Sequence, residues 1–553
     1  MATMEIEVMG RMVMVEEGTT FGEVARGFAD ELEGTILLAR QGNQLRELCN
    51  VVRDAEPITF FDLTNPDGMR VYRRGASFLL VKAVEELFGE DALVVIEHSL
   101  RGNLYCELRK PAIENDAQLA RKLEEKMKEY VARDMPIVKR TFRKDVAREM
   151  VRKQGMMDKA ELFRFRRASN INLYELDGFY DYFYGYMPLS TKDVSLFAIE
   201  PSGFGFFLCL PERQAPTAVS EVQSAKKIQE VFLEQMKWCQ LLEVSNVGEL
   251  NTAITHGEFG DLIRINEALH EKKIAEIADQ IHQRIDTVKI ILIAGPSSSG
   301  KTSFMNRLSV QLRVLGIRPH KLSLDDYFVN RNDSPLDEFG NRDLESVYAL
   351  DLPVLNTDLE KIISGEQVEL PTYNFVTGKR EYKGNTIHLQ HDEILLVEGI
   401  HGLNDMLTES IPNESKFKIF ISALTQLNVD DHNRISTSDS RLIRRMVRDN
   451  QFRGRDAQST IESWYSVTRG EEENIFPFQE NADVVFNSAT VYELSVLKQY
   501  AEPLLFCIQP DQPEYVTAKR LIKFLGYFLA APPTDIPNNS LIKEFVGGSC
   551  FKV

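Results

Sequence analysis

The sequence predicts an α/β protein whose C-terminal half is a doubly wound parallel sheet, and three observations predict it. First, five short apolar segments follow one another from residue 288 on: KIILIA, HKLSLD, EILLVEG, KFKIFIS and ADVVFNS. Second, helical patterns separate these segments, and such alternation is typical of parallel strands joined by helices. Third, the first segment runs directly into GPSSSGKT, a loop framed by glycines at 295–302.

The front part of the chain predicts two smaller domains. Residues 1–63 are expected to form a β-rich domain, with two strands around a Gly-Arg turn, a helix in TFGEVARGFADEL and three further strands. The NPDG motif at 65–68 is a strong turn signal and a predicted boundary. Residues 69–211 predict a mixed α+β domain with helices near 76–88 and 115–133.

The rest of the chain predicts three further parts. Residues 219–287 are helical by pattern and are expected to connect the halves. Residues 288–500 form the predicted parallel-sheet domain, and residues 501–553 its C-terminal extension. Several domains are expected because 553 residues are too many for one ordinary hydrophobic core.

Composition indicates a cytoplasmic globular protein. Hydrophobic residues make up 43% of the chain and charged residues 27%, and no apolar run approaches the roughly 18 residues that a membrane helix needs. We therefore expect no membrane partner. The N-terminus lacks the pattern of an export signal. Six scattered cysteines form no CxxC pair, which argues against a zinc ribbon or a disulfide framework and favours reduced thiols.

The net charge of −18 argues against a protein that coats nucleic acid with its whole surface. The stretch from Arg109 to Arg167 reverses this balance, with 18 Lys or Arg against 10 Asp or Glu. Such runs are most often solvated helix faces, but this one also leaves RNA binding open.

The loop at 295–302 matches the phosphate-binding pattern G-x-x-x-x-G-K-[ST]. Glycines let backbone N–H groups curl around a phosphate, and the start of the following helix adds its dipole. Lys301 would reach the β- and γ-phosphates, and the Thr302 hydroxyl would bind Mg²⁺. We therefore predict ATP and Mg²⁺ as cofactors. The predicted nucleotide contacts are Gly295, Ser297, Ser298, Ser299, Gly300, Lys301, Thr302 and Ser303.

Carboxylates follow two of the apolar segments. Glu398 ends EILLVEG and is predicted to steady the metal, because open α/β sheets gather ligands at the carboxyl ends of their strands. Asp325 and Asp326 follow HKLSL. Phosphoryl transfer to a hydroxyl needs a carboxylate that accepts the proton. Adjacent residues of a strand point to opposite sides, so only one of these two aspartates is expected to serve.

An arginine-rich helix is predicted in RLIRRMVRDNQFRGRD. Arg441, Arg444, Arg445 and Arg448 recur at helical spacing, and Arg453 and Arg455 lie just beyond. A stripe of guanidinium groups suits the charge that develops on a transferred phosphoryl group. A solvated basic face is the alternative.

Together these motifs resemble the uridine kinase and phosphoribulokinase group of P-loop kinases, closest to the uridine–cytidine kinases, over residues 288 to 500. The likeness lies in GPSSSGKT, SLDDYF, NRDLES, PTYNFVTGKR, VEGIHGL and RRMVRDNQFRGRD. It implies an ATP-dependent kinase acting on the 5′-hydroxyl of a nucleoside. It assigns catalysis to Lys301, Asp325, Arg445, Arg448, Arg453 and Arg455. It assigns substrate contacts to Asp325, Tyr327, Asp343, Tyr373 and Phe375.

Two positions depart from that family's pattern. Where the pyrimidine kinases carry a histidine that reads the base, this chain has Gly378, and a later glutamine is replaced by Ser463. Loss of hydrogen-bonding partners relaxes selectivity, so the resemblance leaves the identity of the nucleoside open.

The front half resembles the N-terminal region of threonyl-tRNA synthetases. Residues 1–63 look like the small TGS domain, and residues 69–211 like the editing-type domain that follows it. In the synthetases two histidines, a cysteine and a third histidine carry that site, and here the four positions are Arg74, Phe78, Phe183 and Met187. These side chains do not bind zinc. The resemblance therefore implies a scaffold without its editing site.

Two other functions stay open at this point. One is an RNA-associated protein whose nucleotide site acts as a switch. The other is a kinase for a non-nucleoside hydroxyl, such as a sugar phosphate, although Tyr373 and Phe375 favour a flat base. A homo-oligomer, and an RNA or a regulatory ligand of the front half, are further partners left open.

Overall fold

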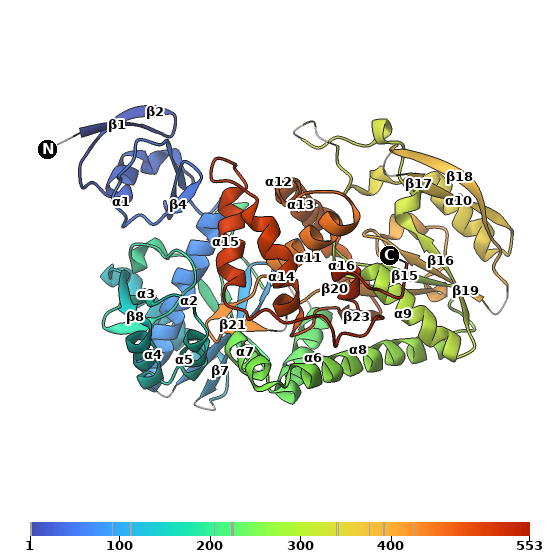
Figure 1. The fold of residues 1–553 in the computed structure, drawn as a ribbon, viewed down its shortest axis with the longest axis horizontal. Coiled ribbons are helices and arrows are strands. Elements are labelled where there is room, and N and C mark those ends of the chain that lie inside the picture. The colour runs from blue at the N-terminus through green and yellow to red at the C-terminus, as the bar shows by residue number, and fades with distance from the viewer. Residues whose placement is uncertain are drawn as a thin grey trace.

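The computed structural model describes residues 3–90, 92–110, 113–203, 205–222, 226–338, 340, 342–374, 377–390, 393–425 and 427–552. Figure 1 shows the chain running from an N-terminal sheet on one side to the C-terminal sheet on the other. The long helix α8 (Phe259–His282) extends along one edge of the molecule toward the C-terminal sheet. Within the described residues, no helix is long and apolar enough to cross a membrane.

The N-terminal segment folds as a five-stranded sheet in the order β2-β1-β5-β3-β4. Its strands are β1 (Thr3–Val8), β2 (Arg11–Glu16), β3 (Leu38–Gln41), β4 (Gln44–Arg46) and β5 (Ile58–Phe61). The predicted helix is shorter than expected, because α1 (Phe21–Ala25) continues as a 3₁₀ turn (Arg26–Glu31). A capping box starts it, with Thr20 and Glu23 each satisfying the other's backbone N–H.

The NPDG motif is not the turn that we predicted but the start of helix α2 (Pro66–Phe88). The Asn65 side chain accepts a hydrogen bond from the Asp67 N–H, and Pro66 occupies the first turn, where no backbone donor is needed. The helix is therefore ten residues longer at its N-terminus than the predicted segment 76–88. Residue types typical of turns are also typical of helix N-caps, which explains the error.

Two antiparallel sheets pack beside α2. One has the order β11 (Ala198–Ser202), β12 (Gly205–Cys209), β7 (Asn103–Lys110) and β6 (Leu93–Leu100). The other has the order β10 (Phe179–Asp181), β9 (Asn170–Leu176) and β8 (Val138–Arg143). Helices α3 (Ala117–Arg133), α4 (Lys144–Lys153) and α5 (Met157–Arg164) complete this part, and a short hairpin, β13 (Pro211–Glu212) and β14 (Ala215–Val219), follows it.

The C-terminal half is the predicted parallel sheet, in the order β16-β19-β15-β20-β23. The strands are β15 (Ile290–Ala294), β16 (Arg318–Ser323), β19 (Glu393–Glu398), β20 (Lys416–Ser422) and β23 (Val484–Asn487), which are the five apolar segments. All neighbouring pairs are parallel. Because β15 lies at the centre, the glycine-framed loop that follows it emerges in the middle of the ligand-binding edge.

Helices and hairpins surround this sheet. The helices are α9 (Lys301–Val314), α10 (Leu352–Ile363), α11 (Thr437–Phe452), α12 (Ala457–Glu462), α13 (Trp464–Asn474) and α14 (Glu493–Phe506). The hairpins are β17 (Val368–Asn374) with β18 (Lys379–Ile387), and β21 (Asn428–Asp430) with β22 (Asn433–Arg434). The region predicted as a helical connector holds α6 (Lys226–Leu242), α7 (Val247–His256) and α8.

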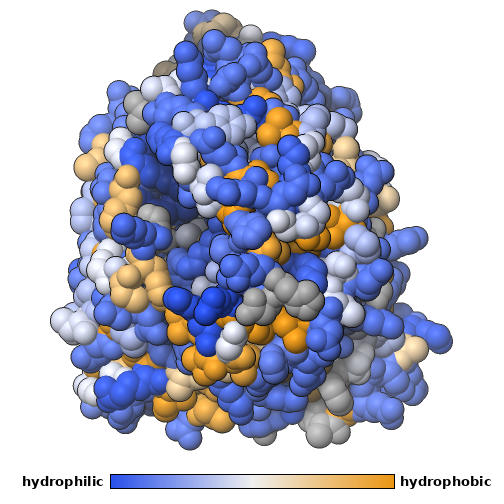
Figure 2. Space-filling view, turned by 90° about the vertical axis from the view of Figure 1, so that its right-hand side faces the viewer, coloured by the Kyte–Doolittle hydropathy of each residue, from blue (hydrophilic) through white to orange (hydrophobic). Residues whose placement is uncertain are grey.

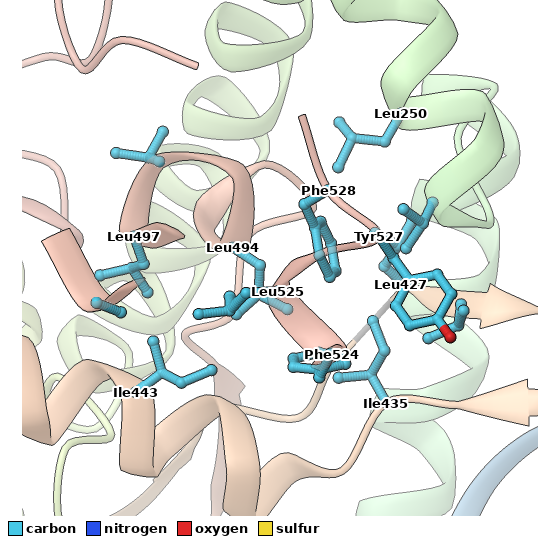
Figure 3. Close-up of a cluster of buried hydrophobic side chains, with 14 of the residues drawn as sticks. Leu250, Leu427, Ile435, Ile443, Leu494, Leu497, Phe524, Leu525, Tyr527 and Phe528 are labelled. Carbon is cyan, nitrogen blue, oxygen red and sulfur yellow. The ribbon is translucent and has the colours of Figure 1, made fainter. Parts of the chain in front are cut away.

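One hydrophobic core joins segments that are far apart in the chain. Helices α15 (Tyr515–Leu525) and α16 (Lys543–Val546) of the C-terminal extension pack in it with α11 and α14. Figure 3 shows Leu250 of α7, Ile443 of α11 and Phe524 of α15 pointing into the same cluster. Ala147 and Phe163 of the front half belong to it as well. The two halves are therefore parts of one packed body.

A buried charge network reinforces this junction. Lys159 on α5 is fully buried, and its Nζ lies 2.8 Å from His432 Nδ1 and 3.3 Å from carboxylate oxygens of both Asp181 and Asp430. Burial by itself would lower the pKa of Lys159, but Asp181 and Asp430 raise it above its usual range. The ammonium is thus the counter-charge of two carboxylates that are 0% exposed. Asp430 and His432 precede helix α11 closely, so the network connects the front half to the start of that helix.

We expect Lys159→Met to lower the free energy of unfolding by about 3–5 kcal/mol, because it leaves Asp181 and Asp430 buried without a counter-charge. Urea denaturation followed by circular dichroism measures this loss. The control is Lys153→Met, which removes an exposed lysine from α4 and should change stability little. An unchanged denaturation midpoint for Lys159→Met would contradict the role assigned to the network.

Candidate active site

The phosphate loop requires both of its glycines, Gly295 for space and Gly300 for backbone conformation. A Cβ on Gly295 would lie 2.0 Å from the carbonyl oxygen of Ile421, so no larger residue fits there. Gly300 has a φ of +84° and serves as the N-cap of α9. Lys301 folds back over the loop, and its Nζ donates to the carbonyl oxygens of Gly295 at 3.0 Å and Pro296 at 3.3 Å. Ser298 and Ser299 are buried within the loop.

Helix α11 holds the phosphate loop through Glu471 of α13. The Ser297 N–H donates to Glu471 Oε1 at 2.8 Å, and Arg441 forms a bidentate pair with the same carboxylate at 2.5 and 2.7 Å. Arg444 is 1% exposed and pairs with Glu493 while donating to Ser298 O at 3.3 Å. The predicted arginine stripe therefore has two kinds of members. Arg441 and Arg444 use their guanidinium groups in buried ion pairs and have a structural role.

The other four arginines have different partners. Arg445 donates to Ser297 Oγ at 2.9 Å, and Arg445, Arg448 and Arg453 all lie within 4 Å of Asp449. Arg455 donates to the carbonyl oxygen of Ser459 at 3.1 Å and to Ser463 Oγ at 3.3 Å. Of these four arginines, Arg445 thus contacts the phosphate loop, whereas Arg455 is held by the residues around α12.

The two aspartates after β16 have different surroundings. They lie on a 3₁₀ turn (Leu324–Tyr327) rather than on the strand. Burial raises the pKa of Asp325, while Lys301, Arg453 and Arg448 lower it, so this carboxylate faces the lysine and the arginines. Asp326 instead accepts a hydrogen bond from the Tyr373 N–H at 3.0 Å and anchors strand β17. Only Asp325 faces the phosphate loop.

Glu398 and Thr302 offer a fitting set of oxygens for Mg²⁺. Glu398 Oε1 accepts from Thr302 Oγ1 at 3.5 Å and from Ser323 Oγ at 3.2 Å. Burial raises the pKa of Glu398 to about 7, against the lowering effect of Lys301. No group of three or more His, Cys, Asp or Glu side chains forms a metal site among the described residues. Mg²⁺ commonly takes only one or two carboxylates and completes its shell with phosphate and water, so this hydroxyl–carboxylate pair suits it.

A cavity of about 140 Å³ has Phe328 in its wall, the residue that follows the turn carrying Asp325. Its lining residues are Phe328, Arg331, Arg342, Leu344 and Tyr373. The rings of Phe328 and Tyr373 lie 5.6 Å apart between centroids. Figure 2 looks onto this end of the molecule, whose surface is mainly hydrophilic around a hollow.

The predicted substrate residues are distributed unevenly around this cavity. Tyr373 lines it, whereas Tyr327 is fully buried and its hydroxyl donates to Asp358 at 3.0 Å, so the aromatic side chain that faces the cavity from that turn is Phe328. Phe375 lies outside the described residues.

Sequence reasoning missed Glu345, which lies near Lys301, Asp325 and Arg445. Burial raises the pKa of Glu345 to about 7, with Glu471 acting in the same direction. Its Oε2 is buried and has no hydrogen-bond partner among the described residues. Asp343, the acid that the sequence resemblance assigned to the substrate, accepts a hydrogen bond from the Glu345 N–H at 3.1 Å. The motif NRDLES contains both acids, but spacing alone could not decide which of them faces the phosphate loop.

The C-terminal extension supplies a second residue that no motif indicated. Glu544 of α16 accepts a hydrogen bond from Ser303 Oγ at 2.7 Å, next to Thr302. It also contributes to the raised pKa of Glu398. The Ser303 hydroxyl, predicted as a nucleotide contact, therefore holds the C-terminal extension against the phosphate loop.

Packed side chains fill the four positions that the sequence resemblance assigned to an editing site. Phe78 and Phe183 lie 5.4 Å apart between ring centroids, and both share a buried core with Met187. Arg74 donates to the carbonyl oxygen of Tyr186 at 2.7 Å. These side chains occupy the space between α2 and the aromatic tract.

We expect Glu345→Gln to stabilise the nucleotide-free protein increasingly as pH rises. The pKa of this carboxyl is raised on folding, so ionised Glu345 destabilises the folded state as pH rises from about 4.5 toward 7, and Gln cannot ionise. Relative to the parent, the variant should gain on the order of 1–3 kcal/mol between pH 5 and pH 8. Urea unfolding at both pH values measures the gain, and the exposed Glu360→Gln controls for net charge. A gain that is constant across pH would contradict the assignment.

Comparison with known proteins agrees with this geometry. The family model "Phosphoribulokinase / Uridine kinase family" matches residues 290–495. A uridine kinase of Bacillus pumilus is 30% identical over 197 residues, which cover 35% of this chain and 84% of that protein. A uridine kinase of Borrelia hermsii is 31% identical over 214 residues, which cover 38% and 93%.

Among solved structures, one titled "Structure of a Possible Uridine Kinase from Bacillus stearothermophilus" aligns at 20% identity with a TM-score of 0.23, covering 38% of this chain and 100% of that one. The phosphate loop, the parallel sheet around it and the sequence relatives lead to one conclusion. Through residues 290–495, the chain belongs to the phosphoribulokinase/uridine kinase family.

Proposed function

We propose that this P-loop kinase transfers the γ-phosphoryl group of ATP to the 5′-hydroxyl of a nucleoside. The observation that carries the proposal is the proximity of Asp325 to Lys301, close in the chain to a cavity with aromatic walls. Asp325 faces Lys301, and three residues further along the chain Phe328 lines the cavity together with Tyr373. Because Phe328 follows Asp325 so closely in the chain, a flat ring held in that cavity could direct its hydroxyl group toward Asp325 and the phosphate loop.

In this mechanism each side chain has a separate role. Lys301, Thr302 and Glu398 would hold MgATP, and the bound Mg²⁺ would neutralise charge on the phosphates. Asp325 accepts the proton of the attacking hydroxyl, and its burial makes it a stronger base than an exposed aspartate. Arg445, Arg448, Arg453 and Arg455 contribute positive charge around the transferred group and exclude water.

The acceptor cavity favours a nucleoside over a small hydroxyl compound. Phe328, Leu344 and Tyr373 offer flat or apolar contact, which suits a base. Near Asp325, Glu345 adds an acceptor that has no partner within the described part of the chain, which suits sugar hydroxyl groups.

The alternative of an RNA-associated switch loses its main support. In the basic stretch many cations are paired with acids, which leaves less free positive charge for phosphates than the sequence indicated. The pairs are Arg109–Glu97, Arg133–Asp177, Lys139–Glu47, Arg140–Glu175, Arg143–Asp145, Arg148–Glu161 and Arg164–Glu161.

For the front half we propose a regulatory role on a TGS-like and editing-like scaffold. The buried Lys159 network and the shared core support it, because both connect this half to the segment that leads into α11. A ligand that shifts α5 would therefore act on the helix that carries Arg445 and Arg448.

We expect Asp325→Asn to lower kcat for phosphoryl transfer by at least about 100-fold while MgATP still binds, because it removes the proton acceptor and keeps the shape. Steady-state kinetics and nucleotide titration measure the two effects. The matched control is Asp326→Asn, whose amide oxygen can still accept from the Tyr373 N–H. Near-normal turnover of Asp325→Asn would exclude Asp325 as the base.

We also expect the full chain to bind no stoichiometric zinc and not to deacylate mischarged tRNA. Buried apolar side chains occupy three of the four positions that would carry the site, and hydrolysis there needs a metal or a polarised water. Elemental analysis and an ester-hydrolysis assay with mischarged tRNA test this. One zinc per chain, or turnover of the ester, would show that the editing site is intact.

A further inference from the structure

One wall of the acceptor cavity depends on a close contact between Arg331 and Gly378. The Arg331 N–H donates to the Gly378 carbonyl oxygen at 2.8 Å. A Cβ on Gly378 would lie 2.7 Å from both Cβ and Nε of Arg331 and 3.0 Å from its Cζ. The backbone fixes the Arg331 Cβ, so no change of side-chain rotamer relieves that contact. The φ of +66° at Gly378 also disfavours any side chain there.

The cavity therefore presents a particular hydrogen-bonding chemistry. Among the described residues that line it, Arg331 and Arg342 contribute guanidinium groups, and none is a carboxylate or an amide side chain. A guanidinium group donates hydrogen bonds and accepts none. The aromatic walls of Phe328 and Tyr373 admit a flat ring. The edge of a flat ring bound between these two aromatic side chains would face the guanidinium donors of Arg331 and Arg342.

Nucleobases differ in how they match such an edge. Guanine offers two adjacent acceptors, N7 and O6, whereas adenine pairs N7 with an amino donor. Cytosine likewise offers N3 and O2 as adjacent acceptors, whereas uracil carries a hydrogen on N3. The planar fork of arginine binds two adjacent acceptors with two parallel hydrogen bonds.

We propose that Arg331 determines the specificity of this kinase by donating two hydrogen bonds to the base of the acceptor nucleoside. It selects bases with two adjacent acceptors, cytosine or guanine, over uracil and adenine. Arg331 lies in the cavity only because residue 378 is glycine. This inference rests on the proposed nucleoside kinase function and adds the substrate class.

The test is kcat/KM for cytidine, uridine, guanosine and adenosine, measured for the parent and for variants. We expect the parent to prefer cytidine over uridine, or guanosine over adenosine, by about 10- to 100-fold. The pair that shows the preference identifies the ring size that the cavity accepts. Arg331→Met should abolish the preference and leave the KM for ATP unchanged. Arg331→Lys, which keeps the charge but loses the fork, should retain at most a small part of it.

Two further variants control the experiment. Gly378→Ala should weaken the same preference without removing any hydrogen-bonding group, because its Cβ displaces Arg331. Arg313→Met, which removes an exposed arginine from α9, should leave the preference as in the parent. Thermal melting by circular dichroism establishes that each variant is folded.

The results distinguish failure of the Arg331 assignment from failure of the proposed nucleoside kinase function. Preference for uridine or adenosine, or a preference that survives Arg331→Met, overturns the assignment of Arg331 while the nucleoside kinase function stands. A parent enzyme that phosphorylates none of the four nucleosides but does phosphorylate a sugar phosphate overturns both.

Discussion

The active site depends on the carboxylate of Glu471, which is 0% exposed and holds two separate elements together. It accepts from the N–H of Ser297 in the phosphate loop and pairs with Arg441 of α11. A buried carboxylate needs such partners, because an unpaired charge in the interior is strongly unfavourable. The loop and the arginine helix are therefore fixed relative to each other, and the negative charge nearby contributes to the raised pKa of Glu345.

A second buried charge connects the front half of the molecule to the segment before α11. Lys159 of α5 satisfies Asp430, two residues before His432 in the segment that leads to α11. The hydrophobic core around Leu250, Ile443 and Phe524 packs at the same junction. Under the regulatory role proposed for the front half, this junction is the route by which a change there would act on the phosphate loop. The long chain before the kinase sheet is thus packed against the segment that leads to α11.

Much of the C-terminal half could be predicted from the sequence, because its features leave patterns in short stretches of consecutive residues. Strands such as Ile290–Ala294 are fully buried, so their apolar runs are continuous and easily recognised. The phosphate loop needs glycine where Gly295 meets the carbonyl oxygen of Ile421, and that requirement leaves a motif. The NPDG segment was predicted wrongly because one set of residues serves both turns and helix caps.

The sequence by itself therefore determined the parallel sheet, its nucleotide loop and the side chains that follow its strands, because each of these has a recognisable pattern in consecutive residues. Only the tertiary structure decided how distant residues are used. It paired Arg441 and Arg444 with carboxylates, directed Glu345 rather than Asp343 toward Lys301, and brought Glu544 to Ser303 across 241 residues of chain. Ion pairing and burial depend on which groups lie close together in the folded protein. The spacing of residues along the chain does not reveal which groups those are.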